Sequence, residues 1–269
     1  MRTRSHITTP KNGVTWYYEQ EGSGPDIVLI TDGFGESHMF DRTITKIARQ
    51  GFRVTTFDGP GMSRSFEAPP EAYNDVTAQK LAAQVIDVMD VLGIREAAFW
   101  GSSSGGSTVL ALAADYPDRV RNGLVHEVPF VQVGAQRGVF AEAAEWDDET
   151  VSKRMGPLVL KLGMADAEAW AGLGDAVHER LAKNFVRWTR GFPPLTASSP
   201  TGEAALKKRP LDWTVGFSTP SGLFFDNIVL AVKMGIPVQT IPGRHFPYLC
   251  EPEAFAEYVV STCQKYLSD

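Results

Sequence analysis

Two kinds of apolar pattern alternate along this 269-residue chain. Short, mostly apolar runs predict β-strands, and they cover residues 14–20, 26–31, 52–57, 96–100, 120–127, 211–217 and 237–241. Segments with apolar residues three or four apart predict helices, and they cover residues 40–49, 76–92, 107–116, 140–146, 167–188, 224–234 and 252–266. Alternation of this kind is typical of an α/β fold with a mostly parallel, doubly wound sheet.

The alternation is interrupted between residues 130 and 208, where helical patterns occur without a clear strand. This predicts a core domain made of residues 1–129 and 209–269, with residues 130–208 inserted as a helical cap or lid. A cap over the ends of the strands would shape a pocket for a sizeable apolar ligand. For the helix at 76–92, Asn74 and Asp75 are the candidate N-terminal caps.

The segment Gly101-Ser102-Ser103-Ser104-Gly105 lies between a predicted strand and a predicted helix. A serine with a glycine two residues to either side, in that context, is typical of a nucleophile elbow. The sharp turn brings neighbouring backbone too close for a Cβ at the glycine positions. Ser103 is therefore the candidate nucleophile, and Gly106 gives the turn further room.

A serine hydroxyl needs a base, and His245 has the best position among the five histidines. It follows the last predicted strand and precedes the last helix, so it should lie at the same edge of the sheet as Ser103. His126, next to Glu127, is a weaker rival. We expect surface or packing roles for His6, His38 and His178.

The acid that would orient His245 is less obvious. Hydrolases with a nucleophile elbow often carry this acid after the strand that corresponds to 211–217, but residues 218–222 contain no carboxylate. Glu127 ends the preceding strand and has a longer side chain, so we favour it. Asp226 is the rival, although its place inside a predicted helix is more typical of a solvated carboxylate.

Acyl transfer also needs donors for the developing oxyanion, and two backbone N–H groups are expected to supply them. One belongs to Ser104, directly after the nucleophile, and the other to Gly33, in the loop after the strand at 26–31. Asp32 stands where hydrolases of this class more often have histidine. It either orients the loop, touches the substrate or only forms an Asp-Gly turn.

Composition narrows the class of partner. The net charge of −6 and the absence of a lysine or arginine block argue against nucleic acid. No apolar segment approaches the roughly 18 residues that span a membrane, and the polar residues 1–6 lead into no signal sequence, so we expect a cytoplasmic protein. The two cysteines are expected to be structural, no metal or other cofactor is expected, and a homodimer remains open.

Residues 101–105, 243–247 and the turn at 58–63 resemble the α/β-hydrolase superfamily. A closer resemblance, to the fungal zearalenone lactonases, is carried by residues 1–5, 15–22, 32–36, 51–58, 126–127, 210–216 and 225–229. It implies hydrolysis of the macrocyclic lactone ester of zearalenone. It also implies a Ser-His-Glu triad, which falls on Ser103, His245 and Glu127.

The resemblance extends to residues 184–193, a segment whose tryptophan contacts the substrate in that family. This places Trp188, with Phe192 and Pro193, among the expected substrate contacts. Phe224 and Phe246 are expected to join them. Residues 128–163 match the family poorly, which leaves the preference among zearalenone and its reduced derivatives open.

The sequence therefore predicts a cofactor-free serine esterase that acts on a lactone. Two rival functions remain. One is an esterase or perhydrolase for another ester or lactone, using the same triad. The other is a ligand receptor built on this fold, which would show little turnover.

Overall fold

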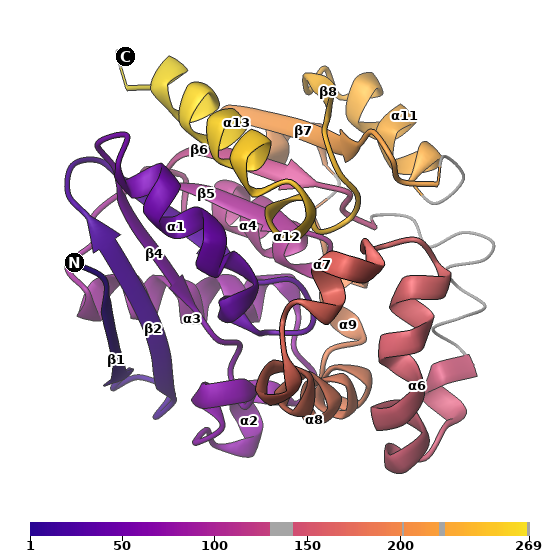
Figure 1. The fold of residues 1–269 in the computed structure, drawn as a ribbon. Helices are drawn as coiled ribbons and strands as arrows, with labels where there is room; N and C mark the ends of the chain where they lie inside the picture. The colour runs from indigo at the N-terminus through magenta and orange to yellow at the C-terminus, as the bar shows by residue number, and fades with distance from the viewer. Residues whose placement is uncertain (130–141, 201, 221–223, 268–269) are drawn as a thin grey trace.

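The computed structural model describes residues 1–129, 142–200, 202–220 and 224–267. Their strands form one sheet in the order β1-β2-β4-β3-β5-β6-β7-β8 (Figure 1). Strand β2 is antiparallel to both of its neighbours, β1 and β4, and strands β3 to β8 are parallel to one another. The strands are β1 (Thr3–Thr8), β2 (Thr15–Gly22), β3 (Asp26–Ile30), β4 (Arg53–Phe57), β5 (Ala97–Ser102), β6 (Val120–His126), β7 (Leu211–Gly216) and β8 (Val238–Ile241). The predicted α/β class is confirmed.

Helices cover both faces of this sheet (Figure 1). The core helices are α1 (Asp41–Ala48), α2 (Pro70–Tyr73), α3 (Ala78–Val91), α4 (Ser104–Asp115), α11 (Phe225–Lys233), α12 (Pro247–Cys250) and α13 (Pro252–Lys265). Short 3-10 turns are η1 (Ser37–Phe40), η2 (Ser63–Ser65) and η3 (Pro117–Arg119).

Strand β3 shows why four successive residues of a central strand, Ile27 to Ile30, are apolar. Val28 and Ile30 pack into the cluster that contains the apolar residues of α3 and α4. Ile27 and Leu29 pack into the opposite cluster, with those of α1 and α13. Successive side chains of a strand point to opposite faces, and here both faces are buried.

Between β6 and β7, the described part of the chain forms helices and no strand, as the pattern predicts. We call α6 (Asp148–Lys161), α7 (Ala167–Ala171), α8 (Asp175–Gly191), α9 (Pro194–Ala197) and α10 (Glu203–Leu206) the insertion helices. Residues 130–141 and 201 of the predicted cap lie outside the described residues. So does the beginning of the helix expected at 140–146.

Three local predictions are wrong in detail. Strand β1 was not expected, because its residues are polar and mostly exposed and only pairing with β2 makes them a strand. The helix expected at 167–188 is two helices, α7 and α8, separated at Gly174, which has a φ of +80°. Helix α3 is capped by Thr77, whose side chain accepts from Lys80 N, rather than by Asn74 or Asp75.

No helix in the described ranges is long and apolar enough to cross a membrane.

His126, at the end of β6, is fully buried. Its Nδ1 lies 2.9 Å from Thr214 Oγ1 on β7, and its Nε2 lies 3.1 Å from the carbonyl oxygen of Arg244. Burial lowers the pKa of His126 to about 4, although the charge of Glu127 acts in the opposite direction. The ring is therefore neutral at pH 7 and joins two strands.

This buried ring should make stability depend on pH. A histidine in the unfolded chain titrates near 6.5. Below that pH the unfolded state therefore binds a proton at this histidine, whereas the folded state keeps it neutral. We expect His126 to lower the free energy of unfolding by on the order of 3 kcal/mol as the pH falls from about 6.5 to 4. Urea unfolding at several pH values measures this loss.

A His126→Gln variant is the matched control. It should be less stable than the wild type at pH 7, because it loses packing and hydrogen bonds, but its stability should fall less steeply between pH 6.5 and 4. Parallel pH profiles for the two proteins would contradict the assignment.

Candidate active site

Ser103 occupies a strained turn between β5 and α4, with a φ of +51°. Its backbone N–H donates to the carbonyl of His126 at 2.9 Å, which ties the turn to β6. A Cβ on Gly101 would lie 2.4 Å from the carbonyl oxygen of Gly105, and one on Gly105 would lie 2.5 Å from that of Thr31. The turn therefore requires glycine at both positions, as the elbow pattern predicts.

Glu127 directly follows β6 and is fully buried, with a φ of +46°. Its Oε2 lies 2.7 Å from His245 Nδ1, and its Oε1 accepts a hydrogen bond from Gly216 N at 2.8 Å. Burial acts to raise the pKa of Glu127, but the adjacent His126 and the hydrogen bond with His245 outweigh it and hold the pKa below its usual value. The carboxylate thus holds the Nδ1 edge of the imidazole.

Asp226, the rival acid, lies in α11 and is exposed. The structure brings Glu127 rather than Asp226 to His245. The reason is register: β6 and β7 are parallel neighbours, and the side chain that follows β6 is anchored by the end of β7.

The other nitrogen of His245 is available. Nε2 is buried and has no hydrogen-bond partner within the described part of the chain. Phe224 stacks on the imidazole, with ring centroids 5.2 Å apart and an interplanar angle of 9°, and Phe246 packs against its edge. His126, the rival base, has both nitrogens engaged elsewhere.

Ser103 and His245 line the same pocket. The core contributes the residues around these two side chains, namely Asp32, Gly33, Phe34, Ser104 and Phe246. The insertion contributes apolar side chains from α6, α8 and the turn after α6, namely Met155, Leu158, Val159, Leu162, Met164 and Trp188. One wall can therefore take an apolar ligand, while the other carries the polar groups.

The loop with Gly33 is held firmly. Asp32 is buried, and its two carboxylate oxygens accept from Phe34 N and Tyr248 Oη, both at 2.7 Å. Burial raises the pKa of Asp32, although these two hydrogen bonds act in the opposite direction. Asp32 thus orients the loop and also borders the pocket.

Two of the expected substrate contacts do not line this pocket. Phe192, just after α8, is buried in the core cluster on the α3 and α4 side, and Pro193 is exposed. Neither residue is among those that line the pocket in this structure. Trp188 and Phe246 do line it, and Phe224 contacts His245 instead.

The sequence interpretation missed the apolar face of α6. Met155, Leu158, Val159 and Leu162 have spacings of three and four residues, which is the signal that could have revealed the face. Periodicity predicts that such a face is covered but does not identify what covers it.

Comparisons with known proteins agree with this geometry. Residues 26–218 match the family described as the alpha/beta hydrolase fold. Zearalenone hydrolase from Bionectria ochroleuca is 54% identical over 99% of this chain and 100% of its own length. Zearalenone hydrolase from Cladophialophora bantiana is 52% identical over 99% of this chain and 98% of its own.

A solved structure of a hydrolase from Pseudomonas aeruginosa PA01 has the same fold, with a TM-score of 0.73 at 21% sequence identity. The match covers 97% of this chain and 98% of that one. By fold, by family and by likeness along its whole length, this chain belongs to the alpha/beta hydrolase fold family and to the branch of it that contains the zearalenone hydrolases.

Proposed function

We propose that this protein is a serine hydrolase that opens the macrocyclic lactone ester of zearalenone and related resorcylic lactones. The observation that carries the proposal is the 2.7 Å contact between Glu127 and His245, at a pocket that Ser103 also lines. The relatives over 50% identical along the chain, both named zearalenone hydrolase, support the choice of substrate.

In the first half of the reaction, Ser103 Oγ attacks the lactone carbonyl carbon while His245 Nε2 takes its proton. Glu127 holds the imidazole in the required tautomer and stabilises the imidazolium. The backbone N–H groups of Gly33 and Ser104 stabilise the oxyanion.

In the second half, the C–O bond of the ester breaks and His245 protonates the leaving alkoxide. The ester is cyclic, so the alcohol stays attached to the acyl-enzyme. Water, deprotonated by His245, then releases the carboxylic acid and restores Ser103. One lactone and one water give one hydroxy acid.

Residues 130–208 serve as the cap of this site. Their contribution, including Met155 and Trp188, gives the pocket an apolar wall, which suits an apolar ligand.

The direct test is to incubate the protein with zearalenone and follow the mass of the product. We expect each product molecule to gain the mass of one water and the opened product then to lose carbon dioxide, with many turnovers per protein molecule. A panel of simple aryl esters separates a lactonase from a general esterase. Stoichiometric binding without turnover would favour the receptor, and would contradict the proposal.

Replacing the nucleophile should separate binding from chemistry. We expect Ser103→Ala to reduce hydrolysis of zearalenone to the background rate, because the attacking oxygen is lost. The dissociation constant for zearalenone, measured by calorimetry, should change by no more than a few-fold. Unchanged turnover would sink the assignment of Ser103.

Replacing the acid should impair catalysis without removing the nucleophile. Glu127→Gln can still accept from Gly216 N, but its amide N–H₂ faces His245 Nδ1 and favours the wrong tautomer. We expect kcat to fall by roughly 10²- to 10⁴-fold, as when the acid of a serine-histidine-acid triad is replaced by its amide. Steady-state kinetics measures the loss.

Asp226→Asn is the matched control, since it removes the rival carboxylate from the exposed surface of α11. Its kcat should stay within about twofold of the wild type, as for surface changes away from the site. The reverse ranking of the two variants would assign the acid to Asp226.

A further inference from the structure

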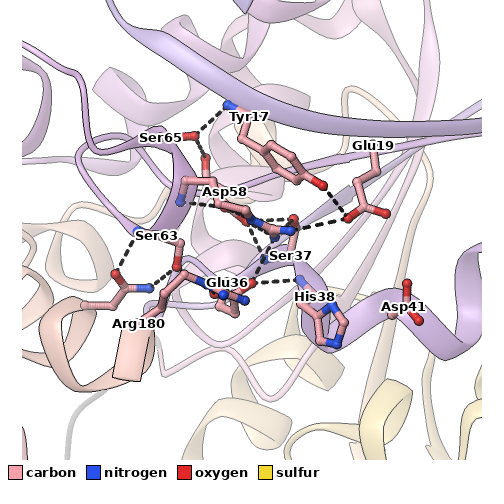
Figure 2. A network of polar contacts seen from close by, with 12 residues as sticks. Tyr17, Glu19, Glu36, Ser37, His38, Asp41, Asp58, Ser63, Ser65 and Arg180 are labelled. Atoms are coloured by element: carbon pink, nitrogen blue, oxygen red, sulfur yellow. Dashed lines mark hydrogen bonds and ion pairs between the residues drawn. The ribbon is translucent and has the colours of Figure 1, made fainter. Parts of the chain in front are cut away.

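One face of α8 meets the loop that carries Gly33. Arg180, Asn184 and Trp188 are four residues apart, so they lie above one another on the same side of the helix. Each of them contacts the segment 33–36, which we call the oxyanion loop. In Figure 2, Arg180 approaches Glu36 from a helix that comes from a different part of the chain.

Asn184 is only 2% exposed, and its side-chain hydrogen bonds all go to the core. Its Nδ2 donates to the carbonyl oxygen of Phe34 at 2.7 Å and to Ser63 Oγ at 2.6 Å. Its Oδ1 accepts from Ser63 N at 2.9 Å. Since Asp32 holds the N–H of Phe34, this residue is fixed from both sides.

Arg180 reaches the other end of the loop. Its Nε donates to Glu36 Oε2 at 2.6 Å, and Glu36, 1% exposed, also accepts from Arg64, Ser63 Oγ and His38 N. Burial acts to raise the pKa of Glu36, but the hydrogen bond from Arg180 and the charge of Arg64 hold it below its usual value. Loss of Arg180 would leave a buried carboxylate with one cation fewer.

The indole of Trp188 packs directly against Gly33. A Cβ on Gly33 would lie 2.1 Å from Trp188 Nε1, so the indole lies directly over the glycine backbone. The oxyanion loop is therefore enclosed between the core and one face of α8.

We propose that this face of α8 positions the oxyanion loop, with Asn184 as the main positioning residue. The inference rests on the proposed function. Asn184 touches no reacting atom in this scheme. It holds the carbonyl of Phe34, while Asp32 holds the Phe34 N–H and Trp188 packs on Gly33, so the backbone on both sides of Gly33 is restrained before the substrate arrives.

A donor is effective only when it is aimed in advance at the place where negative charge develops. Misplacement by about 1 Å can cost on the order of 100-fold in rate. The insertion would thus contribute to catalysis through its contacts with this loop, in addition to forming a wall of the pocket.

Two substitutions of Asn184 test this. Asn184→Asp can keep the acceptor for Ser63 N but places a carboxylate beside the carbonyl of Phe34, and Asn184→Leu removes all three hydrogen bonds at similar size. For both, we expect kcat for zearalenone to fall about 10- to 100-fold with KM changed less than threefold. The nearby exposed variant Lys183→Ala should match the wild type.

A second readout excludes a merely structural role. Affinity for a boronic acid, which forms a tetrahedral adduct with Ser103, should fall in proportion to kcat/KM. Affinity for intact zearalenone, measured in a Ser103→Ala background, should stay nearly constant. Thermal melting identifies any variant that does not fold.

If the Asn184 variants do not fold, Arg180→Met and Arg180→Lys replace them. The first should lower kcat and the second should restore part of it, because lysine can still pair with Glu36. Folded Asn184 variants with wild-type kcat, or with a loss in KM alone, would overturn this inference. An inactive wild type would instead overturn the proposed function.

Discussion

Parallel pairing of β3, β5, β6 and β7 brings the ends of four strands to one edge of the sheet. Ile30 is paired with Gly101, Ser102 with His126, and His126 with Thr214, so the residues that follow these strands start from adjacent positions. The Gly33 loop, the Ser103 turn and Glu127 all begin there. The proposed chemistry depends on this register, since a shifted strand would separate the nucleophile from its partners.

Glu127, the candidate acid after β6, shows how this register is used. Its oxygens are divided between His245 and the backbone of Gly216, so one carboxylate joins the histidine loop to the end of β7. A positive φ at Glu127 directs the chain out of the strand. This arrangement buries the charge of Glu127 next to His126. Because the pKa of His126 is low, that histidine stays neutral at pH 7 and adds no second buried charge.

The insertion is joined to this edge by polar contacts as well as by packing. Buried ion pairs are weak contributors to net stability, because desolvation offsets most of their attraction. They are directional, however, and removing one partner destabilises the fold because it leaves the other charge buried and unpaired. The contacts among Arg180, Glu36 and Arg64 therefore suit a role in fixing geometry, where an apolar contact would allow sliding.

The sequence by itself determined most of the order of strands and helices and indicated an elbow at Ser103 and His245 as the candidate base, because these depend on local periodicity and on chain order. It favoured Glu127 over Asp226 by the absence of a carboxylate in residues 218–222. Only the tertiary structure joined Glu127 to His245, placed Phe192 in the core cluster beside α3 and α4, and brought Asn184 to Phe34. These contacts join segments as much as 150 residues apart, and a hydrophobic pattern specifies which face of an element is buried but not which distant element covers it.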